Sequence, residues 1–347
     1  MILSVMEQIN TLGDFLQASG SQYQVFDLGR RIVPIDHVAF QQIEALSSPY
    51  PYPLQGHAFL GIVFWKSADS HFVWFLKLPL DERGLIQPAA RTQFMQQVLE
   101  GLGQDPTQPL SQEQQQELAS NILVFTPSQN KLATFNAKVK QTLGQSASAQ
   151  YELAYQYLSG QMPSEHWQQL GLQGIADFVA RLDELDHAEV LLRALAKLPE
   201  PVLQPVLSCL ENQKLNDDLA GAIAAHVMDS LNNDVAPERL HSWLRGLAGH
   251  PGKAQMVCEA LLAHPKLDVN SLAIIAARHW PQFERPEFAL QYLEAAALQE
   301  FEVFAQLFAD LVAIPSVRVN LLAQLRNPER SEALGSAIGQ LFKGTIG

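Results

Sequence analysis

The chain has 347 residues, of which 47% are hydrophobic and 17% charged, and its formal net charge is −13. These values are typical of a folded globular protein that is long enough for two domains. An acidic chain lacks the basic surface that binding to nucleic acid or to anionic lipid requires, so we expect neither of these partners.

The N-terminal segment is predicted to form an amphipathic helix. Val5, Ile9, Leu12 and Leu16 recur at helical spacing. A signal peptide would need a continuous apolar stretch, and Glu7 interrupts the one present here. No apolar run of the chain reaches the roughly 18 residues of a membrane span, so no membrane insertion is expected. We therefore expect a cytoplasmic protein.

Two short strands and a helix are predicted next. Tyr23–Val25 and Ile32–Val33 flank a turn at Asp27–Arg30, in which Gly29 can adopt a positive φ. A helix from about residue 36 to 46 follows, with Asp36 as its N-cap. The proline-punctuated stretch "SSPYPYPLQG" after it is predicted to be extended.

A long hairpin, "FLGIVFWKSADSHFVWFLKLPL", is then expected. A turn centred on Ala68–Asp69 pairs Trp65 with Phe72. Both faces are apolar, unlike those of a half-exposed sheet, so we expect both to be covered, either by flanking helices or by another chain. We favour the helices, because amphipathic ones flank the hairpin in sequence. Trp74 and Phe75, which point to opposite faces, are therefore both predicted to be buried.

Three further elements complete the predicted α+β domain of residues 1–145. Residues 89–102 form a helix, and a capping box at Ser111 opens a short one. The apolar stretch "NILVF", residues 121–125, is a third strand candidate that lies beside the hairpin. A second capping box, residues 126–129 with proline at the first helical position, opens a helix to about Leu143.

The remainder, residues 146–347, is predicted to be entirely helical. Phe304, Leu307, Phe308 and Leu311 follow the spacing of an amphipathic helix. Pro205 falls inside a helical stretch, where a break or kink is expected. Five other prolines are predicted to mark helix starts: Pro237, Pro251, Pro286, Pro315 and Pro328.

This helical part repeats. "LRALAKLP" at Leu192 returns as "LRGLAGHP" at Leu244, an offset of 52 residues, and "AIAAH" at Ala222 returns as "IIAAR" at Ile274. Such a repeat indicates an α-solenoid of HEAT or armadillo character, although its period is longer than usual for those folds. The predicted fold is therefore a small, mostly antiparallel sheet covered by helices, followed by an all-α helical-repeat domain.

Few residues suggest chemistry. The chain has no phosphate-binding glycine loop and no pair of histidines at helical i, i+4 spacing. The segment "RLDELDHAEV" could form a weak metal site through Asp183, Glu184, Asp186 and His187, but we favour a helix terminus with an acidic first turn. We therefore expect no metal, no cofactor and no catalytic residue.

The charged loops at the ends of the predicted strands are the candidate site of the N-terminal domain. A hydrolase or transferase that uses Asp81 or Glu82 as its base is conceivable there, but a solvated turn is the favoured interpretation. The two tyrosines of the proline-rich stretch could form a docking ledge for a partner or a stiff, half-buried loop, and both alternatives stay open. The candidate residues are Arg30, Arg31, Tyr50, Tyr52, Asp81, Glu82 and Arg83.

Three stretches, "FDLGRR", "PYPYPLQ" and "FVWFLKLPLDE", resemble the uncharacterised bacterial family known as domain of unknown function 3549. The resemblance extends over the full length of the chain. It implies no activity, cofactor or site residue, because none is assigned to that family.

The leading hypothesis is a non-enzymatic, cytoplasmic protein-interaction or scaffold protein that presents a helical-repeat surface to a protein partner. Because the chain is acidic, the partner is expected to be basic, and a homo-oligomer is possible. The alternative is an enzyme or small-molecule-binding protein with its site near Arg30 and Asp81.

Overall fold

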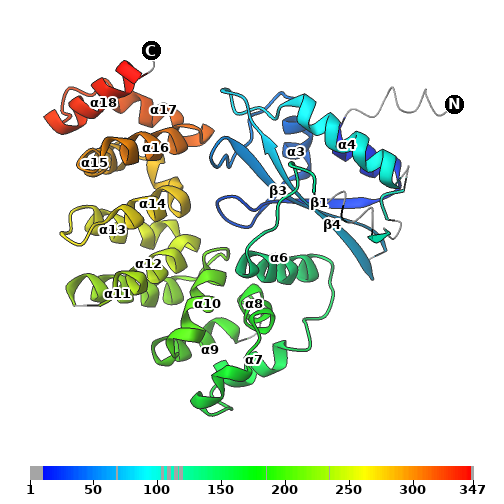
Figure 1. Ribbon diagram of the computed structural model, residues 1–347. Coiled ribbons are helices and arrows are strands. Elements are labelled where there is room, and N and C mark those ends of the chain that lie inside the picture. The colour runs from blue at the N-terminus through cyan, green and yellow to red at the C-terminus, as the bar shows by residue number, and fades with distance from the viewer. Residues whose placement is uncertain are drawn as a thin grey trace. The chain divides into compact units, whose positions relative to one another are not determined.

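The computed structural model describes residues 11–67, 69–102, 105–107, 111–112, 116, 120–184, 186–233 and 235–344. By its contacts the chain forms two compact units, one of residues 1–128 with 142–145 and one of residues 129–141 with 146–347. Helix α6 (Gln129–Thr142) precedes the predicted domain boundary in sequence, yet nearly all of it belongs to the helical unit (Figure 1).

The first unit contains a four-stranded antiparallel sheet with the strand order β2-β1-β3-β4. Its strands are β1 (Gln22–Asp27), β2 (Val33–Ile35), β3 (His57–Ser67) and β4 (Ser70–Pro79). The two short strands and the long hairpin are those that the sequence predicts, so the predicted α+β class of this unit is confirmed.

The hairpin register differs from the predicted one. Ser67 pairs with Ser70 across a two-residue turn, as predicted, but Trp65 pairs with His71 and not with Phe72. The reason is a β-bulge between residues 65 and 67, which inserts one extra residue into β3. Every pair farther from the turn than this bulge is therefore shifted by one position.

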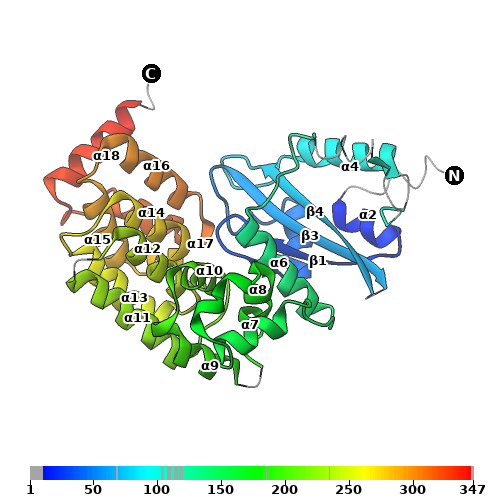
Figure 2. The same cartoon turned by 60° about the horizontal axis from the view of Figure 1, so that its bottom comes forward.

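Three helices cover one face of this sheet: α2 (Leu12–Ala18), α3 (His37–Glu44) and α4 (Pro88–Leu102) (Figure 2). Asp36 caps α3 as predicted, because its carboxylate accepts hydrogen bonds from two backbone N–H groups of the first turn. Of the predicted first helix, residues 1–10 lie outside the described residues. The core on this face includes Leu12, Phe15, Leu16, Val25, Phe40, Ile43, Leu60, Ile62, Phe64, Leu76, Phe94 and Val98.

The aromatic side chains of β4 are less buried than the sequence predicts. Trp74 contacts the rings of Phe15 and Phe94 on the helix-covered face, and Phe75 contacts the ring of Phe125 on the other face. Both Trp74 and Phe75 are nevertheless only half-buried, so the prediction that both are buried is wrong. The physical reason is that β4 is the last strand of the sheet, where side chains have a neighbouring strand on one side only.

The segment "NILVF" lies beside β4, as predicted. Leu76 and Val124 form an isolated antiparallel bridge, flanked by hydrogen bonds from the Lys77 N–H to Leu123 (2.7 Å) and from the Phe125 N–H to Phe75 (3.1 Å). The segment covers part of the outer edge of β4 without forming a regular strand. Of the predicted capping box at residues 111–114, residues 113 and 114 lie outside the described residues.

In the part of the second unit that the structure describes, every regular element is a helix, as predicted. No described helix is both long enough and apolar enough to span a bilayer. After α6 come α7 (Tyr151–Leu158), α8 (Leu172–Ala180), α9 (His187–Ala194), α10 (Glu200–Leu210), α11 (Asp217–Asn232), α12 (Pro237–Gly246), α13 (Pro251–Leu262), α14 (Val269–Arg278), α15 (Pro286–Ala296), α16 (Phe301–Val312), α17 (Pro315–Gln324) and α18 (Glu332–Gly344), with short 3₁₀ turns η1 (Ser164–Gln169), η2 (Leu195–Lys197), η3 (Leu247–Gly249) and η4 (Trp280–Glu284).

These helices stack in two layers (Figure 1). Helices α8, α10, α12, α14, α16 and α18 each contact the next and form the even layer, and α7, α9, α11, α13, α15 and α17 form the odd layer. Helices of the even layer begin at residues 172, 200, 237, 269, 301 and 332, so the stacking period is 28–37 residues. This period is shorter than the 52-residue offset of the sequence repeat.

The 52-residue repeat nevertheless matches the structure element by element. It places η2 on η3, α10 on α13, and the first part of α11 on α14. The N-caps of the last pair, Asn216 and Asp268, also correspond, and each accepts a bond from the N–H three residues later. Because the offset spans three helices, equivalent helices lie in opposite layers.

The prolines mostly mark helix starts. Four of the five predicted positions open α12, α13, α15 and α17. Pro328 does not, because α18 begins only at Glu332. Of the break or kink predicted at Pro205, the break does not occur, since α10 continues through this residue, and the neighbouring Val206 and Leu207 are buried.

Candidate functional site

A buried polar network, the Asp27 clamp, lies at the turn between β1 and β2. Its centre is the carboxylate of Asp27, which accepts hydrogen bonds from the backbone N–H groups of Gly29 and Arg30, both at 3.1 Å. The hydroxyl of Tyr50 donates to the same carboxylate at 2.6 Å, and Nε of Arg30 donates to the carbonyl of Pro53 at 2.9 Å. These bonds fasten the proline-rich segment to the turn.

The clamp brings together two residues that the sequence suggested, Arg30 and Tyr50, but in a structural role. Asp27, Arg30 and Tyr50 are all fully buried, so a ligand cannot reach them from solvent. Burial, together with the nearby Asp27 carboxylate, raises the pKa of Tyr50 well above its ordinary value, which keeps the hydroxyl protonated as a donor. For Tyr50, the structure therefore favours the stiff buried loop over the docking ledge.

Sequence reasoning missed Asp27, the centre of the clamp. A signal was present, because an aspartate before a glycine-containing turn bonds the backbone N–H groups two and three residues later. Tyr52 and Arg31 lie half-buried beside the clamp, and the Tyr52 ring meets the Tyr50 ring edge-on at 6.3 Å. Burial and then Asp27 raise the pKa of Tyr52, while Arg31 acts in the opposite direction.

The second predicted loop, residues 81–83, is a turn held by its own aspartate. Oδ1 of Asp81 accepts hydrogen bonds from the N–H groups of Arg83 (2.9 Å) and Leu85 (2.8 Å). Glu82 and Arg83 are exposed. The carbonyl of Gly84 accepts a hydrogen bond from the backbone of Tyr50, so this turn supports the proline-rich segment. Asp81 thus acts as a turn residue here.

The acidic cluster at the start of α9 is accounted for by local partners. The hydroxyl of Tyr155 contacts both carboxylate oxygens of Asp186 at 3.1 Å, and the Tyr151 hydroxyl lies 2.7 Å from Nε2 of His187. Within the described ranges, no group of three or more His, Cys, Asp or Glu side chains is placed to hold a metal ion. The arrangement agrees with a helix terminus.

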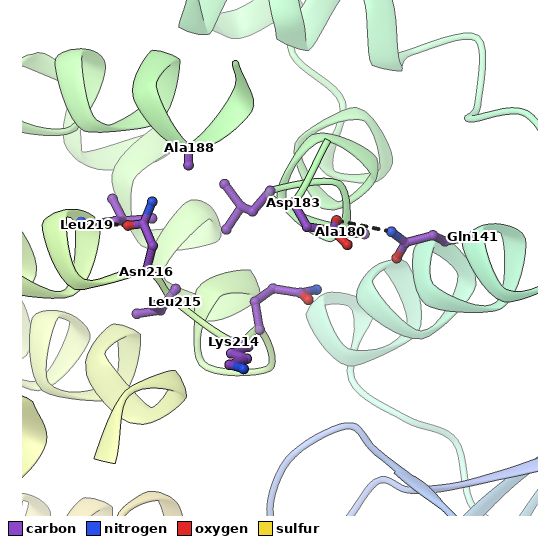
Figure 3. A pocket seen from close by; sticks show the side chains of 10 residues that line it. Gln141, Ala180, Asp183, Ala188, Lys214, Leu215, Asn216 and Leu219 are labelled. Atoms are coloured by element: carbon purple, nitrogen blue, oxygen red, sulfur yellow. Dashed lines mark hydrogen bonds between the residues drawn. The ribbon is translucent and has the colours of Figure 1, made fainter. Parts of the chain in front are cut away.

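A hollow of about 420 Å³, the α6–α11 hollow, opens among α6, α9 and the loops around them (Figure 3). Gln141 of α6 donates to Asp183 across it at 3.4 Å, and Lys214 adds a positive charge. Gln213 accepts from Lys138 at 3.2 Å, while its buried Nε2 has no partner among the described residues. Both signs of charge line this hollow, so it shows no preference for either sign in a ligand.

A larger hollow of about 540 Å³ lies on the even layer, across α10, α12 and α14; we name it the Arg-pair groove. Ala273, Ile274 and Ala277 give it an apolar strip along α14. Arg245 of α12 and Arg278 of α14 lie at one end of it.

Beneath this end, one buried carboxylate holds both arginines. Oε2 of Glu211, which is 2% exposed as a side chain, accepts from Nε of Arg245 at 2.9 Å and from Nε of Arg278 at 3.1 Å. Burial raises the pKa of Glu211, but the Arg278 and Arg245 guanidinium groups outweigh burial and hold that pKa below its ordinary value. Glu211 is therefore ionised at neutral pH.

The sequence carried a signal for this cluster that reasoning from motifs missed. Glu211, Arg245 and Arg278 follow one another at intervals of 34 and 33 residues, which lie within the stacking period of the even layer. Side chains separated by one stacking period lie on neighbouring helices of the same layer. The signal becomes readable only when the stacking period is known.

One further acidic side chain, Glu238, lines the groove, and a second, Asp268, contacts the groove residue His241. Asp268, the N-cap of α14, accepts from Nε2 of His241 at 3.1 Å. Glu238 is exposed on α12. The positive charge of the groove is thus concentrated at the end formed by Arg245 and Arg278.

The chain belongs to the family described as "Protein of unknown function (DUF3549)", whose profile matches residues 7–342. This match confirms the resemblance seen in the sequence. Comparisons with curated proteins and with solved structures give no match.

Proposed function

We propose that this chain is a non-enzymatic protein-interaction protein that binds a partner through the Arg-pair groove of the even layer. One observation supports this proposal above others: the groove crosses three successive helices of the stack, α10, α12 and α14. Stacked helical repeats characteristically bind extended partners along such a continuous surface.

The composition of the groove also supports a protein partner. An apolar strip formed by Ala273, Ile274 and Ala277 lies next to the arginines and to amide side chains. Apolar contact area beside arginine and a polar rim is the usual composition of protein–protein interfaces.

The alternative, an enzyme or a small-molecule binder with its site at the strand ends, has less support. Arg30 and Tyr50 are buried in the Asp27 clamp, and the Asp81 carboxylate is engaged by its own turn. A general base needs access to substrate, which buried Arg30 and Tyr50 do not have. The Asp81 side chain is 37% exposed, but its carboxylate holds two N–H groups of its own turn and lies 3.7 Å from Nε of Arg83.

The proposal includes a cytoplasmic location. Cys209 and Cys258 are buried, free thiols, which is in keeping with a reducing compartment. Cell fractionation tests the location.

The net charge of −13 favours long-range attraction of a basic partner, and a second copy of the chain is a further candidate.

Site-specific photocrosslinking in the native host tests the proposed surface. A photoreactive residue replaces Ala273, which is exposed in the groove, in the full-length chain. The matched control replaces Met256, which is 57% exposed on α13 of the odd layer. We expect a defined crosslinked protein band from position 273 and not from position 256, followed by direct binding of the purified partner. Equal crosslinking at both positions, or none at position 273, would contradict the proposal.

A further inference from the structure

We propose that the Arg-pair groove recognises an acidic side chain in an extended segment of the partner protein, through Arg245 and Arg278. This inference rests on the proposed function and adds the chemistry of the partner. The net charge of −13 would by itself favour a basic partner, whereas this groove is proposed to bind an acidic side chain.

The first argument is local charge. One carboxylate, Glu211, contacts both guanidinium groups, so this cluster has a net positive charge although the whole chain has a net charge of −13. Glu238 and Asp268 are acidic, but Asp268 is engaged with His241. An incoming carboxylate is therefore attracted to the arginine end and repelled from the rest of the rim.

The second argument is the number of hydrogen-bond donors that remain. Each arginine uses Nε on Glu211, and Arg245 adds a long contact from Nη2 at 3.5 Å. Among the residues that the structure describes, Nη1 of Arg245 and Nη2 of Arg278 have no hydrogen-bond acceptor. The Arg245 side chain is 40% exposed and that of Arg278 is 13% exposed, so a ligand in the groove meets Arg245 first.

The third argument is preorganisation. Arginine binds carboxylates through a planar fork of donors, and binding is weakened when the flexible side chain must first be ordered. Here the buried Glu211 fixes both guanidinium groups before the ligand arrives, which reduces that cost.

The fourth argument distinguishes a peptide from a free anion. The apolar strip of Ala273, Ile274 and Ala277 continues from the arginine end along α14, and Asn270 and Gln204 supply amide groups that can bond a peptide backbone. These features favour an acidic residue with aliphatic neighbours in an extended chain.

The test uses the full-length protein and a short fluorescein-labelled peptide of alternating glutamate and leucine, with binding measured by fluorescence anisotropy. Two analogue peptides replace glutamate by glutamine or by lysine. We expect saturable binding of the glutamate peptide that weakens with added salt. The glutamine peptide should bind at least about tenfold more weakly than the glutamate peptide, because the charged hydrogen bonds are lost.

Variants locate the binding. R245Q should weaken binding of the glutamate peptide about tenfold, with unchanged circular dichroism. The matched control is R285Q, because Arg285 is 33% exposed and pairs with Glu259 at 2.7 Å on the odd layer; its affinity should equal that of the wild type.

Four results would overturn the inference: no saturable binding of the glutamate peptide, equal binding of its glutamine analogue, tighter binding of the lysine peptide, or equal losses in R245Q and R285Q. The peptide comparison needs no variant and is independent of any effect on folding. If crosslinking at position 273 succeeds while the peptides fail, the groove still binds a partner and only the acidic preference is wrong. If the peptides bind as expected and crosslinking fails, the proposed function is wrong and the carboxylate site remains.

Discussion

Replacement of Glu211 by glutamine should destabilise the helical unit by about 3 kcal/mol at neutral pH. The substitution keeps the shape but removes the charge that balances two guanidinium groups, and loss of one partner from a buried ion pair costs about 3–5 kcal/mol. Arg278 is only 13% exposed and stays desolvated, whereas Arg245 is 40% exposed and can turn to water. The glutamine oxygen still accepts one hydrogen bond, so the lower end of the range applies.

The effect should depend on pH. Arg278 and Arg245 hold the pKa of folded Glu211 below its ordinary value, and in the unfolded chain a glutamate has a pKa of about 4.3. A carboxyl group whose pKa is lower in the folded state stabilises fully above its unfolded pKa, and this stabilisation is lost as the pH falls through the folded pKa. Glutamine does not titrate. The stability difference between the wild type and E211Q should therefore be full at pH 7 and shrink below about pH 4.3.

Urea unfolding followed by far-UV circular dichroism, at neutral pH and through the acid range, measures this difference. The control is Glu259→Gln, which removes a 39% exposed carboxylate paired with Arg285 at 2.7 Å and should cost less than about 1 kcal/mol. The reasoning fails if E211Q loses no more stability than E259Q, or if its deficit stays constant down to low pH.

Three further predictions concern packing and are measured by the same unfolding experiment. Tyr50→Phe removes a hydroxyl that donates to a buried carboxylate and should cost about 1.5–3 kcal/mol of stability. The control is Tyr292→Phe, which removes an equally buried hydroxyl that donates to a backbone carbonyl and should cost about 0.5–1.5 kcal/mol. Equal costs would contradict the role of the clamp. Gly249→Ala places a Cβ against the backbone carbonyl of Gln213 and should cost about 1–3 kcal/mol of stability. The control is Gly221→Ala in α11, where the new Cβ meets open space and should stabilise the protein by about 0.5–1 kcal/mol. An unchanged stability of Gly249→Ala would refute the close approach of Gly249 to this carbonyl. Trp74→Ala should cost about 3 kcal/mol, the lower end for a core aromatic, because the side chain is half-buried, and an unchanged free energy of unfolding would show that its ring contacts are not stabilising.

Local signals in the sequence located most elements of the fold. Asp36 caps its helix, four prolines open theirs, and the hairpin turn follows Ser67. The hairpin register could not be predicted in the same way. Both faces of the hairpin are apolar, so a one-residue slip exchanges one apolar face for another and the hydrophobic pattern does not penalise it. The bulge before Ser67 thus left no trace in that pattern.

The candidate site was harder to predict because sequence does not reveal burial. Arg30 and Tyr50 were identified as notable polar residues, but only the structure shows that Asp27 draws both into a closed clamp. The cluster of Glu211, Arg245 and Arg278 depends on contacts between helices far apart in sequence. No local motif encodes such contacts, since they follow from the stacking period.

The 52-residue repeat and the two-helix stacking period therefore carry different information. The repeat preserves local structure: Asn216 and Asp268 are equivalent caps, and Glu211 and Ala263 are equivalent C-caps of α10 and α13. Because three helices separate the copies, equivalent positions lie on opposite layers and meet different neighbours. At the position where the even layer places Glu211 beneath two arginines, the odd layer has Ala263, which cannot hold them. The position equivalent to Arg245 is Ala297, so the second copy lacks one of the two arginines as well as the carboxylate. The repeat thus supplies helices to both layers, while the cluster of Glu211, Arg245 and Arg278 that we propose to bind a partner belongs to the even layer.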